Sequence, residues 1–316
     1  MKHKLVLVLG VGIMLVLVVL ASRCIDFGGE EKEEKKTYSA VICITSNSEF
    51  TSENSVNSGS GTESDPYIIE DLDIDASTAE GINIRNTTVY FIIRNCVIHN
   101  GKSNEHGGIF LYNVTNGKID NVTSYNNFDG IYLVSSSNNT ITKCTVYDNS
   151  FVGIMLYVSS DNNTVSNCSI YDNSEMGIWL LYSSNNNIIS KCALYNNYVG
   201  ILSEYSSNTE IHHCNIYDNG NYGIRNRYSN HEYLINATYN WWGSANGPSD
   251  VGPGTGDAVT SNVLYDPWLT EPVEGVDWTP PEGGFIPGFN LIILIVGIGV
   301  AIILFRRRKK RLINEK

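Results

Sequence analysis

Two acidic side chains, Asp148 and Asp172, follow a tyrosine in matching stretches of sequence 24 residues apart. The same position holds Asn196 in the next matching stretch and Asp218 in the one after. If such stretches stack on one another, the two carboxylates come within about 5 Å and repel unless a cation lies between them. Calcium suits such oxygen ligands. A surface calcium site and a pair of ordinary turn residues, interchangeable with Asn, both remain open.

Other metal chemistry has less support in the sequence. The adjacent pair His212 and His213 would face opposite sides of a strand and could not share one ion from regular geometry. The middle of the chain also lacks a row of Met residues, and its remaining histidines are His99, His106 and His231. We therefore expect no cofactor, with calcium as the one candidate and copper disfavoured.

A repeated sequence unit must position the acidic side chains and histidines described above. The pair Gly-Ile recurs at intervals of 22 to 27 residues, beginning at Gly81, Gly108, Gly130, Gly153, Gly177, Gly200 and Gly223. Within the repeats Leu is scarce while Ile, Val, Thr, Tyr and Asn are abundant, which favours short strands over helices. We predict an all-β fold, a single-stranded right-handed parallel β-helix. It would be a three-faced solenoid of about 23 residues per coil with terminal transmembrane segments.

Stacked coils would place equivalent residues in rows. The isoleucines from Ile82 to Ile224 would form an internal row, and the turn asparagines would form amide ladders that bond each coil to the next. A third internal row would hold Cys96, Cys144, Cys168, Cys192 and Cys214. Neighbouring Cβ atoms in stacked parallel strands lie further apart than a disulfide requires, so we expect packed thiols. A metal–thiolate site is the alternative.

Two outward rows are candidate binding surfaces. The residue after each Gly-Ile pair should point away from the core, giving a stripe of Phe110, Tyr132, Met155, Trp179 and Leu202. A second outer row contains Tyr125, Tyr147, Tyr171, Tyr195 and Tyr217. Sugar rings stack on such side chains, and a polypeptide could also cover them. A binding face and a stripe buried by neighbouring parts of the protein are both compatible with the sequence.

Asn-x-Ser/Thr triplets are frequent, as expected for Asn-rich turns. The glycosylation candidates are Asn86, Asn113, Asn121, Asn138, Asn162 and Asn236. We expect Asn167 to be the doubtful one, because it precedes the buried Cys168.

The tandem Gly-Ile-x-Leu, Ser-x-Asn-Asn and Asn-x-Ile units resemble the β-helix repeats of NosD-type and CASH proteins, the carbohydrate-binding and sugar-hydrolase repeats. Residues 59–70 and 240–269 are similar to the first and last segments of such repeats in archaeal cell-surface proteins. The resemblance covers about residues 55–270. It implies a scaffold shared by lyases, hydrolases, epimerases, adhesins and accessory proteins. The Asn-Thr-Asp, Asp-Asp and Gly-His-Gly strings of polygalacturonase-like enzymes are absent from this sequence.

The two ends predict the cellular location. Residues 1–24 read as a signal peptide or signal anchor, because Lys2 and Lys4 precede a long apolar run. We predict a polar spacer and lead-in segment (25–54), the β-helix (55–270), a Pro/Gly stalk (271–286), a transmembrane helix (287–305) and a basic cytoplasmic tail (306–316). The Pro-Gly-Phe before the second apolar run resembles the PGF-type sorting signals of archaeal surface proteins, in which a lipid anchor replaces the tail.

We therefore expect a membrane-anchored cell-surface protein whose extracellular β-helix binds glycans or envelope components, such as a surface layer, without catalysis. A polysaccharide lyase or hydrolase of the pectate-lyase-like superfamily is the alternative, and a NosD-like copper accessory protein is the second. Residues 25–305 contain 11 basic and 32 acidic side chains. This charge repels phosphate backbones, so we expect no nucleic-acid partner.

Overall fold

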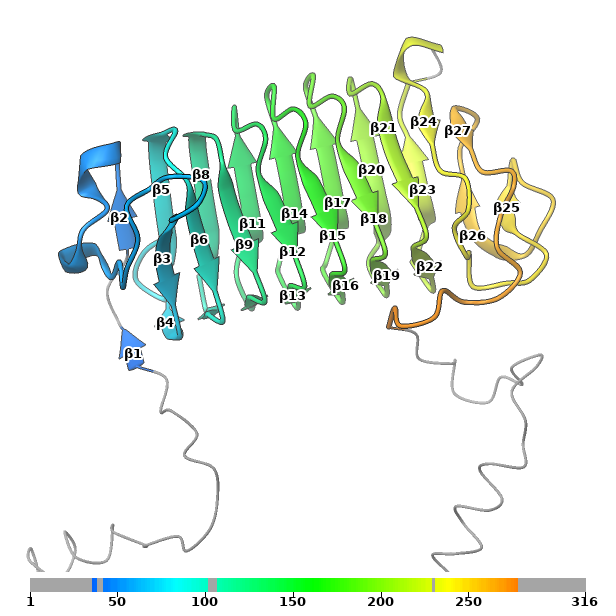
Figure 1. Ribbon diagram of the computed structural model, residues 1–316. Helices are drawn as coiled ribbons and strands as arrows, with labels where there is room; N and C mark the ends of the chain where they lie inside the picture. The colour runs from blue at the N-terminus through cyan, green and yellow to red at the C-terminus, as the bar shows by residue number, and fades with distance from the viewer. Residues whose placement is uncertain (1–35, 39–41, 102–106, 229–230, 278–316) are drawn as a thin grey trace, which may run out of the picture. The chain divides into compact units, whose positions relative to one another are not determined.

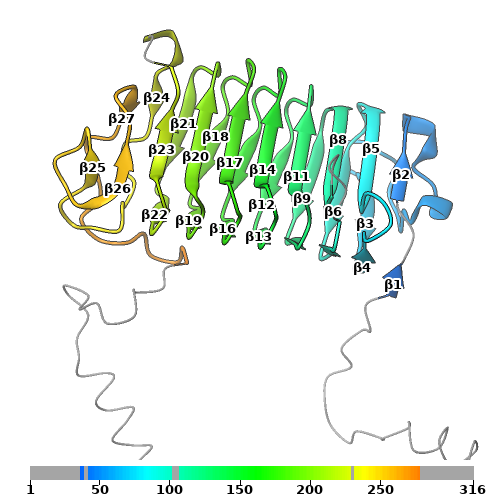
Figure 2. The same cartoon turned by 180° about the vertical axis from the view of Figure 1, so that it is seen from behind.

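The computed structural model describes residues 36–38, 42–101, 107–228 and 231–277 (Figure 1). There the chain winds into a parallel β-helix, and Figure 2 shows the same stack of coils from behind. Within these ranges the helical segments are three short 3-10 turns, η1 (Asn47–Glu49), η2 (Ser52–Asn54) and η3 (His231–Tyr233). The predicted all-β class is confirmed.

Each regular coil contributes one strand to each of three sheets. The eight-stranded sheet contains, in spatial order, β1 (Lys36–Tyr38), β4 (Leu72–Asp75), β7 (Val97–His99), β10 (Thr123–Tyr125), β13 (Thr145–Tyr147), β16 (Ser169–Tyr171), β19 (Ala193–Tyr195) and β22 (Asn215–Tyr217). The ten-stranded sheet contains β2 (Ile42–Ile44), β5 (Ile82–Thr87), β8 (Ile109–Val114), β11 (Asp129–Val134), β14 (Val152–Tyr157), β17 (Met176–Leu181), β20 (Val199–Glu204), β23 (Tyr222–Asn226), β26 (Gly256–Val259) and β25 (Pro248–Asp250). The nine-stranded sheet contains β27 (Val263–Leu264), β24 (Ile235–Asn236), β21 (Thr209–His212), β18 (Ile188–Ser190), β15 (Thr164–Ser166), β12 (Thr140–Thr142), β9 (Gly117–Asp120), β6 (Phe91–Arg94) and β3 (Tyr67–Glu70).

The predicted isoleucine row runs through the interior. Ile82, Ile109, Ile131, Ile154, Ile178, Ile201 and Ile224 pair in register from coil to coil, and all are buried. Each coil removes its neighbour's apolar side chains from water, which is the main favourable term in the stability of such a solenoid.

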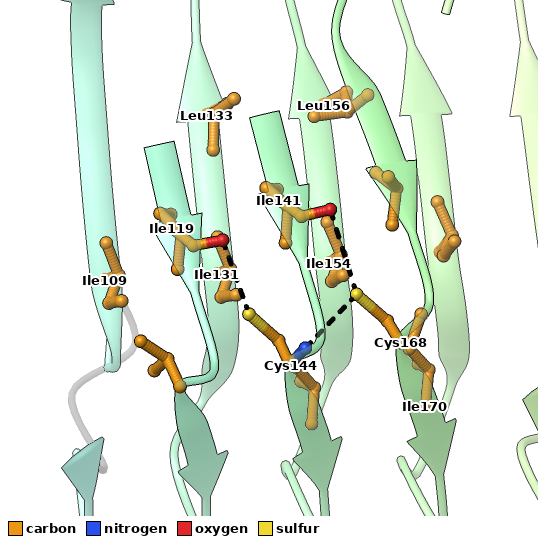
Figure 3. Close-up of a cluster of buried hydrophobic side chains, with 14 of the residues drawn as sticks. Ile109, Ile119, Ile131, Leu133, Ile141, Cys144, Ile154, Leu156, Cys168 and Ile170 are labelled. Carbon is orange, nitrogen blue, oxygen red and sulfur yellow. Dashed lines mark hydrogen bonds between the residues drawn. The ribbon is translucent and has the colours of Figure 1, made fainter. Parts of the chain in front are cut away.

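The cysteines form the predicted internal row beside these aliphatic side chains (Figure 3). All five are buried, whereas Cys43 is exposed. The backbone N–H of Cys144 donates to Cys168 Sγ at 3.4 Å, while Cys144 Sγ donates to the Ile119 carbonyl at 3.7 Å. Burial raises the pKa of Cys144, Cys168 and Cys192 well above the ordinary thiol value, so these groups pack as small neutral side chains.

The predicted asparagine ladders are also present. In the ladder of Asn127, Asn149, Asn173, Asn197 and Asn219, each side-chain oxygen accepts the backbone N–H of the asparagine one coil earlier, at 3.0 to 3.2 Å. A second ladder joins Asn139, Asn163 and Asn187 at another corner of the coil, at 2.9 and 2.8 Å. These bonds satisfy backbone donors that the strands cannot pair at the corners.

The predicted membrane segments, residues 1–24 and 287–305, lie outside the described residues, as do the basic tail and residues 278–286 of the stalk. Within the part of the chain that the structure describes, no helix has the length and apolar character needed to span a bilayer.

Candidate functional site

The predicted outer stripe lies on the outer side of the ten-stranded sheet. Phe110, Tyr132, Met155, Trp179 and Leu202 pair in register on neighbouring strands. Phe110, Met155 and Leu202 are nevertheless only 4%, 7% and 8% exposed, whereas Tyr132 and Trp179 are half-buried. Of the two interpretations that the sequence leaves open, burial by neighbouring parts of the protein therefore holds at three of the five positions.

A second apolar cluster on the outer face of the ten-stranded sheet, which we call the outer cluster, buries Met155 and Leu202. Phe110 instead contacts the Tyr132 ring and lies under the Arg85 guanidinium. Val152, Met176 and Val199, which precede the repeated glycines, pack in the outer cluster against Met155 and Leu202. The coils approach one another closely at these glycines, since a Cβ on Gly153 would lie 2.6 Å from the Gly177 carbonyl oxygen of the next coil. Simple alternation of strand side chains breaks here, because Val152 packs in the outer cluster with Met155 while Ile154 lies in the core.

An unpaired acid borders this cluster. Asp129 is in register with Val152 and Met176 and is only 4% exposed. It accepts the backbone N–H of Val152, but its Oδ1 has no hydrogen-bond partner among the described residues. Burial raises the pKa of Asp129 to about 7. Burial, and then the charge of Asp129, raise the pKa of Tyr132.

Exposed aromatic rings gather at the corner that follows the ten-stranded sheet. Tyr182, Tyr205 and Tyr228 occupy equivalent positions in three successive coils, and we call them the tyrosine track. Tyr182 and Tyr205 are 49% and 38% exposed, and their ring centroids lie 5.8 Å apart in a stacked arrangement. The Tyr205 and Tyr228 centroids lie 3.9 Å apart. The track is a ribbon of aromatic surface along the coil axis.

The backbone at the track is strained for a tyrosine. Tyr182 and Tyr205 have φ angles of 51° and 53°, in the left-handed region that bulky side chains rarely adopt. The equivalent residues in the two preceding coils are Ser135 and Val158, also at positive φ, so the turn itself does not require an aromatic ring. The turn therefore imposes the left-handed conformation, and the side chain at this position varies from coil to coil.

An ion pair adjoins the tyrosine track. Glu204, which precedes Tyr205, is buried and bonds Arg227, which precedes Tyr228. The hydrogen bond with Tyr205, followed by burial, raises the pKa of Tyr228 to about 12. The two phenols and the ion pair therefore hold one another in place.

The second predicted row is a continuous ring stack on the eight-stranded sheet. Successive centroids from Tyr125 through Tyr147, Tyr171 and Tyr195 to Tyr217 lie 5.1, 5.1, 4.8 and 4.9 Å apart. Residues 273–277 dock on this sheet. Asn215 accepts the Val273 N–H at 2.8 Å and donates to the Val276 carbonyl at 3.2 Å, and Asp277 bonds Ser169. The first part of the predicted stalk thus lies against the solenoid.

Asp148 and Asp172 lie in left-handed turn positions and line an open depression of about 560 Å³, together with Asn196 and Asp218. Burial, and then the charge of Asp148, raise the pKa of Asp172, while a hydrogen bond from Asn196 lowers it. Among the described residues, no group of three or more His, Cys, Asp or Glu side chains is placed to hold a metal ion. His99 bonds Asp73 at 2.9 Å. His212 contacts Glu210 at 3.7 Å in a different coil, so these two histidines do not share a site.

The glycosylation candidates lie at corners of the coils. Asn86, Asn113, Asn121, Asn138 and Asn162 are exposed and Asn236 is half-buried. Asn167 is exposed as well, although Cys168 beside it is buried. The Asn167 backbone has a positive φ of 54°, and the residue is as accessible as the other exposed candidates.

Sequence reasoning missed the tyrosine track, although a signal was present. Tyr-Ser recurs at Tyr182, Tyr205 and Tyr228 at intervals of 23 residues, immediately before the Ser/Asn turns. Asp129 had no such signal, because its counterparts Val152, Met176 and Val199 are all apolar.

Comparison with known proteins agrees with this architecture. The sequence matches the family described as right handed beta helix region over residues 36–189 and 80–239, more than half of the chain, so the chain belongs to that family. The solenoid is therefore the right-handed parallel β-helix that the sequence predicts. No curated protein sequence matches the chain.

Several solved structures are similar to this chain at low sequence identity. The A-module of the mannuronan C-5 epimerase AlgE6 from Azotobacter vinelandii is 17% identical, with a TM-score of 0.49 over 63% of this chain and 64% of that chain. Pectate lyase Pel9A is 12% identical, with a TM-score of 0.48 over 76% and 68%. The periplasmic alginate epimerase AlgG is 18% identical, with a TM-score of 0.43 over 62% of this chain and 50% of that chain. At these identities the likeness concerns the fold alone.

Proposed function

We propose that this protein is a membrane-anchored cell-surface β-helix protein that binds glycans at the tyrosine track without catalysing a reaction. The observation that carries the proposal is the exposed stack of Tyr182 and Tyr205. Pyranose rings present apolar faces that pack on aromatic rings, and tyrosine adds a hydroxyl for hydrogen bonding. The apolar runs at both ends of the sequence and the basic cluster from Arg306 to Arg311 support membrane anchoring with an extracellular β-helix.

Glycan binding is tested with the purified full-length protein on a polysaccharide array, followed by titration of the strongest ligand. The double variant Tyr182→Ser/Tyr205→Ser should bind at least about tenfold more weakly, since each ring contributes on the order of 1 kcal/mol. Tyr239→Ser is the matched control, because Tyr239 is 49% exposed, has a φ of 59° and lies at another corner. An array without hits, or equal losses in both variants, would overturn the proposal.

The membrane part is tested separately. The protein should sediment with membranes after an alkaline wash, and deletion of residues 287–316 should release it. Recovery of the intact chain in the soluble fraction would contradict anchoring.

One observation favours the enzymatic alternative as a second candidate. Asp129 is a buried carboxyl group with a pKa raised to about 7, next to Tyr132, and such groups are typical of acid–base catalysis. A polysaccharide lyase or hydrolase would use it to move a proton on a bound sugar chain. Release of unsaturated or reducing ends by the wild type, lost in Asp129→Asn but retained in Tyr239→Ser, would support this candidate over binding alone.

A further inference from the structure

Charge around the tyrosine track restricts which glycans it can accept. Arg227 immediately precedes Tyr228 in the sequence, and its guanidinium is bonded to the buried Glu204. Arg225 lies near the end of β23, where its guanidinium is 5.6 Å from the centroid of the Tyr222 ring. The arginine that adjoins the track is therefore neutralised by an acid, and Arg225 is engaged with a ring on the strand.

Other basic side chains of the solenoid are neutralised in the same way. Arg85 pairs with Glu80 at 3.9 Å, Arg94 with Glu70 at 2.6 Å and Lys118 with Asp120 at 2.7 Å. Acidic groups stand near the track instead, with Asp161 in the turn after β14 and the exposed Glu210 just after the Tyr205 turn. A carboxylated sugar chain would meet net negative potential here, which opposes its binding.

Ring spacing restricts the shape of the ligand. The track places one ring in each coil, and the coils repeat at about 4.8 Å, close to the length of one sugar residue in an extended chain. A linear polysaccharide that runs parallel to the coil axis can therefore contact Tyr182, Tyr205 and Tyr228 in succession. The edge-on contact of Tyr157 with Tyr182, with centroids 5.7 Å apart at 62°, limits the width of the ribbon.

We infer that the tyrosine track selects an uncharged, linear polysaccharide aligned with the solenoid axis and rejects polyuronates. This inference rests on the proposed function and adds the ligand class. Specificity arises from apolar contact together with the neutralisation of Arg227 by Glu204, so the affinity for the neutral chain should be nearly independent of salt.

Matched polysaccharide pairs test the inference. Polygalacturonate and alginate are titrated against the full-length protein beside their carboxyl-reduced forms, which keep the linkage and lose the charge. The reduced chains should bind at least about tenfold more tightly than the acidic ones, and Tyr182→Ser/Tyr205→Ser should abolish the difference. Acidic chains that bind as tightly as the reduced ones, through the same tyrosines, would overturn the charge inference while leaving glycan binding intact. Failure of both members of both pairs, together with an empty array, would overturn the proposed function itself.

A charge variant gives an independent check. Glu204→Gln keeps the shape of the side chain but frees the Arg227 guanidinium beside the rings. The variant should bind polygalacturonate more tightly than the wild type at low salt, and this gain should disappear at high salt. No gain in a variant that melts like the wild type would contradict the role of the ion pair in excluding acidic chains.

Discussion

The carboxylate of Asp257 accepts two hydrogen bonds from Asn219, one from its backbone N–H at 3.2 Å and one from its side-chain amide at 2.7 Å. Asp257 stands where a further coil would present another asparagine, so the amide ladder ends on an acid. Burial raises the pKa of Asp257 to about 7, although both bonds from Asn219 lower it.

This end of the ladder makes stability depend on pH. A carboxyl group with a raised folded pKa stabilises the fold most below its ordinary pKa of 3.8, and this contribution is lost as the pH rises through about 7. We expect the free energy of unfolding to fall by on the order of 2 kcal/mol between about pH 5 and about pH 8 from Asp257 alone. Urea unfolding of Asp257→Asn at several pH values should show a flatter profile. Asp129→Asn should remove a further part of the slope, and an unchanged slope in both variants would contradict the assignment.

The interior of the ladder should be sensitive to the loss of one amide. Asn173 accepts the N–H and side-chain amide of Asn149 at 3.2 and 2.9 Å and donates to Asn197 at 3.0 Å. Asn173→Ala leaves buried donors unpaired and should lower the free energy of unfolding by about 2 to 4 kcal/mol. Asn221→Ala, whose side chain makes a surface bond of 3.3 Å to Tyr198, should change it by less than about 0.5 kcal/mol. Equal effects in the two variants would show that the ladder bonds do not matter.

The cysteine row should be chemically inert in the native protein. Its thiols are buried and three of them have raised pKa values, so few thiolates form and reagents cannot reach them. Among the described cysteines, only the exposed Cys43 should react rapidly with a thiol reagent, and the other five should react after unfolding in urea. Mass spectrometry after a short labelling pulse would identify the sites. Rapid native labelling of Cys144 or Cys168 would contradict the packing.

Calcium should have little effect on the depression at Asp148 and Asp172. Its carboxylates are interspersed with amides and the depression is open, so a calcium ion would gain few charged ligands. Millimolar calcium should raise the melting temperature by less than about 1 °C. A rise of several degrees that is absent in Asp148→Asn/Asp172→Asn would establish the calcium site.

The docked segment should depend on one side chain. Asn215 is buried and bonds both Val273 and Val276, so Asn215→Ala should release residues 273–277 from the eight-stranded sheet. Hydrogen exchange of the Val273 amide should accelerate at least about tenfold. The same amide should be unaffected in Asn221→Ala, and equal protection in both proteins would contradict docking through Asn215.

Much of the fold could be predicted because the coils repeat the same pattern of inward isoleucines and turn asparagines. Ile131 and Ile154 align because their strands pair in register, and Asn149 and Asn173 align because a left-handed residue precedes each of them. A single sequence shows such rows directly, since every copy supports the others.

The surface was harder to predict because it depends on the bends between strands. Alternation predicts that Met155 and Leu202 lie outside, but it does not predict that Val152 and Met176 pack against the same row. Regular alternation from Ile154 would place Val152 in the core, and this alternation fails at the intervening Gly153. The exposure of Tyr182 likewise depends on a turn whose direction only the folded coil reveals.

Register between coils also controls how this protein could change in length. Duplication of one whole coil would extend every ladder and add a ring to the tyrosine track, leaving the hydrogen bonds of the older coils in place. Insertion of a single residue within a strand would instead send that strand's inward side chains to the solvent. Evolution can therefore adjust the span of the surface in whole-repeat steps, and the length of sugar chain that fits should change by the same steps.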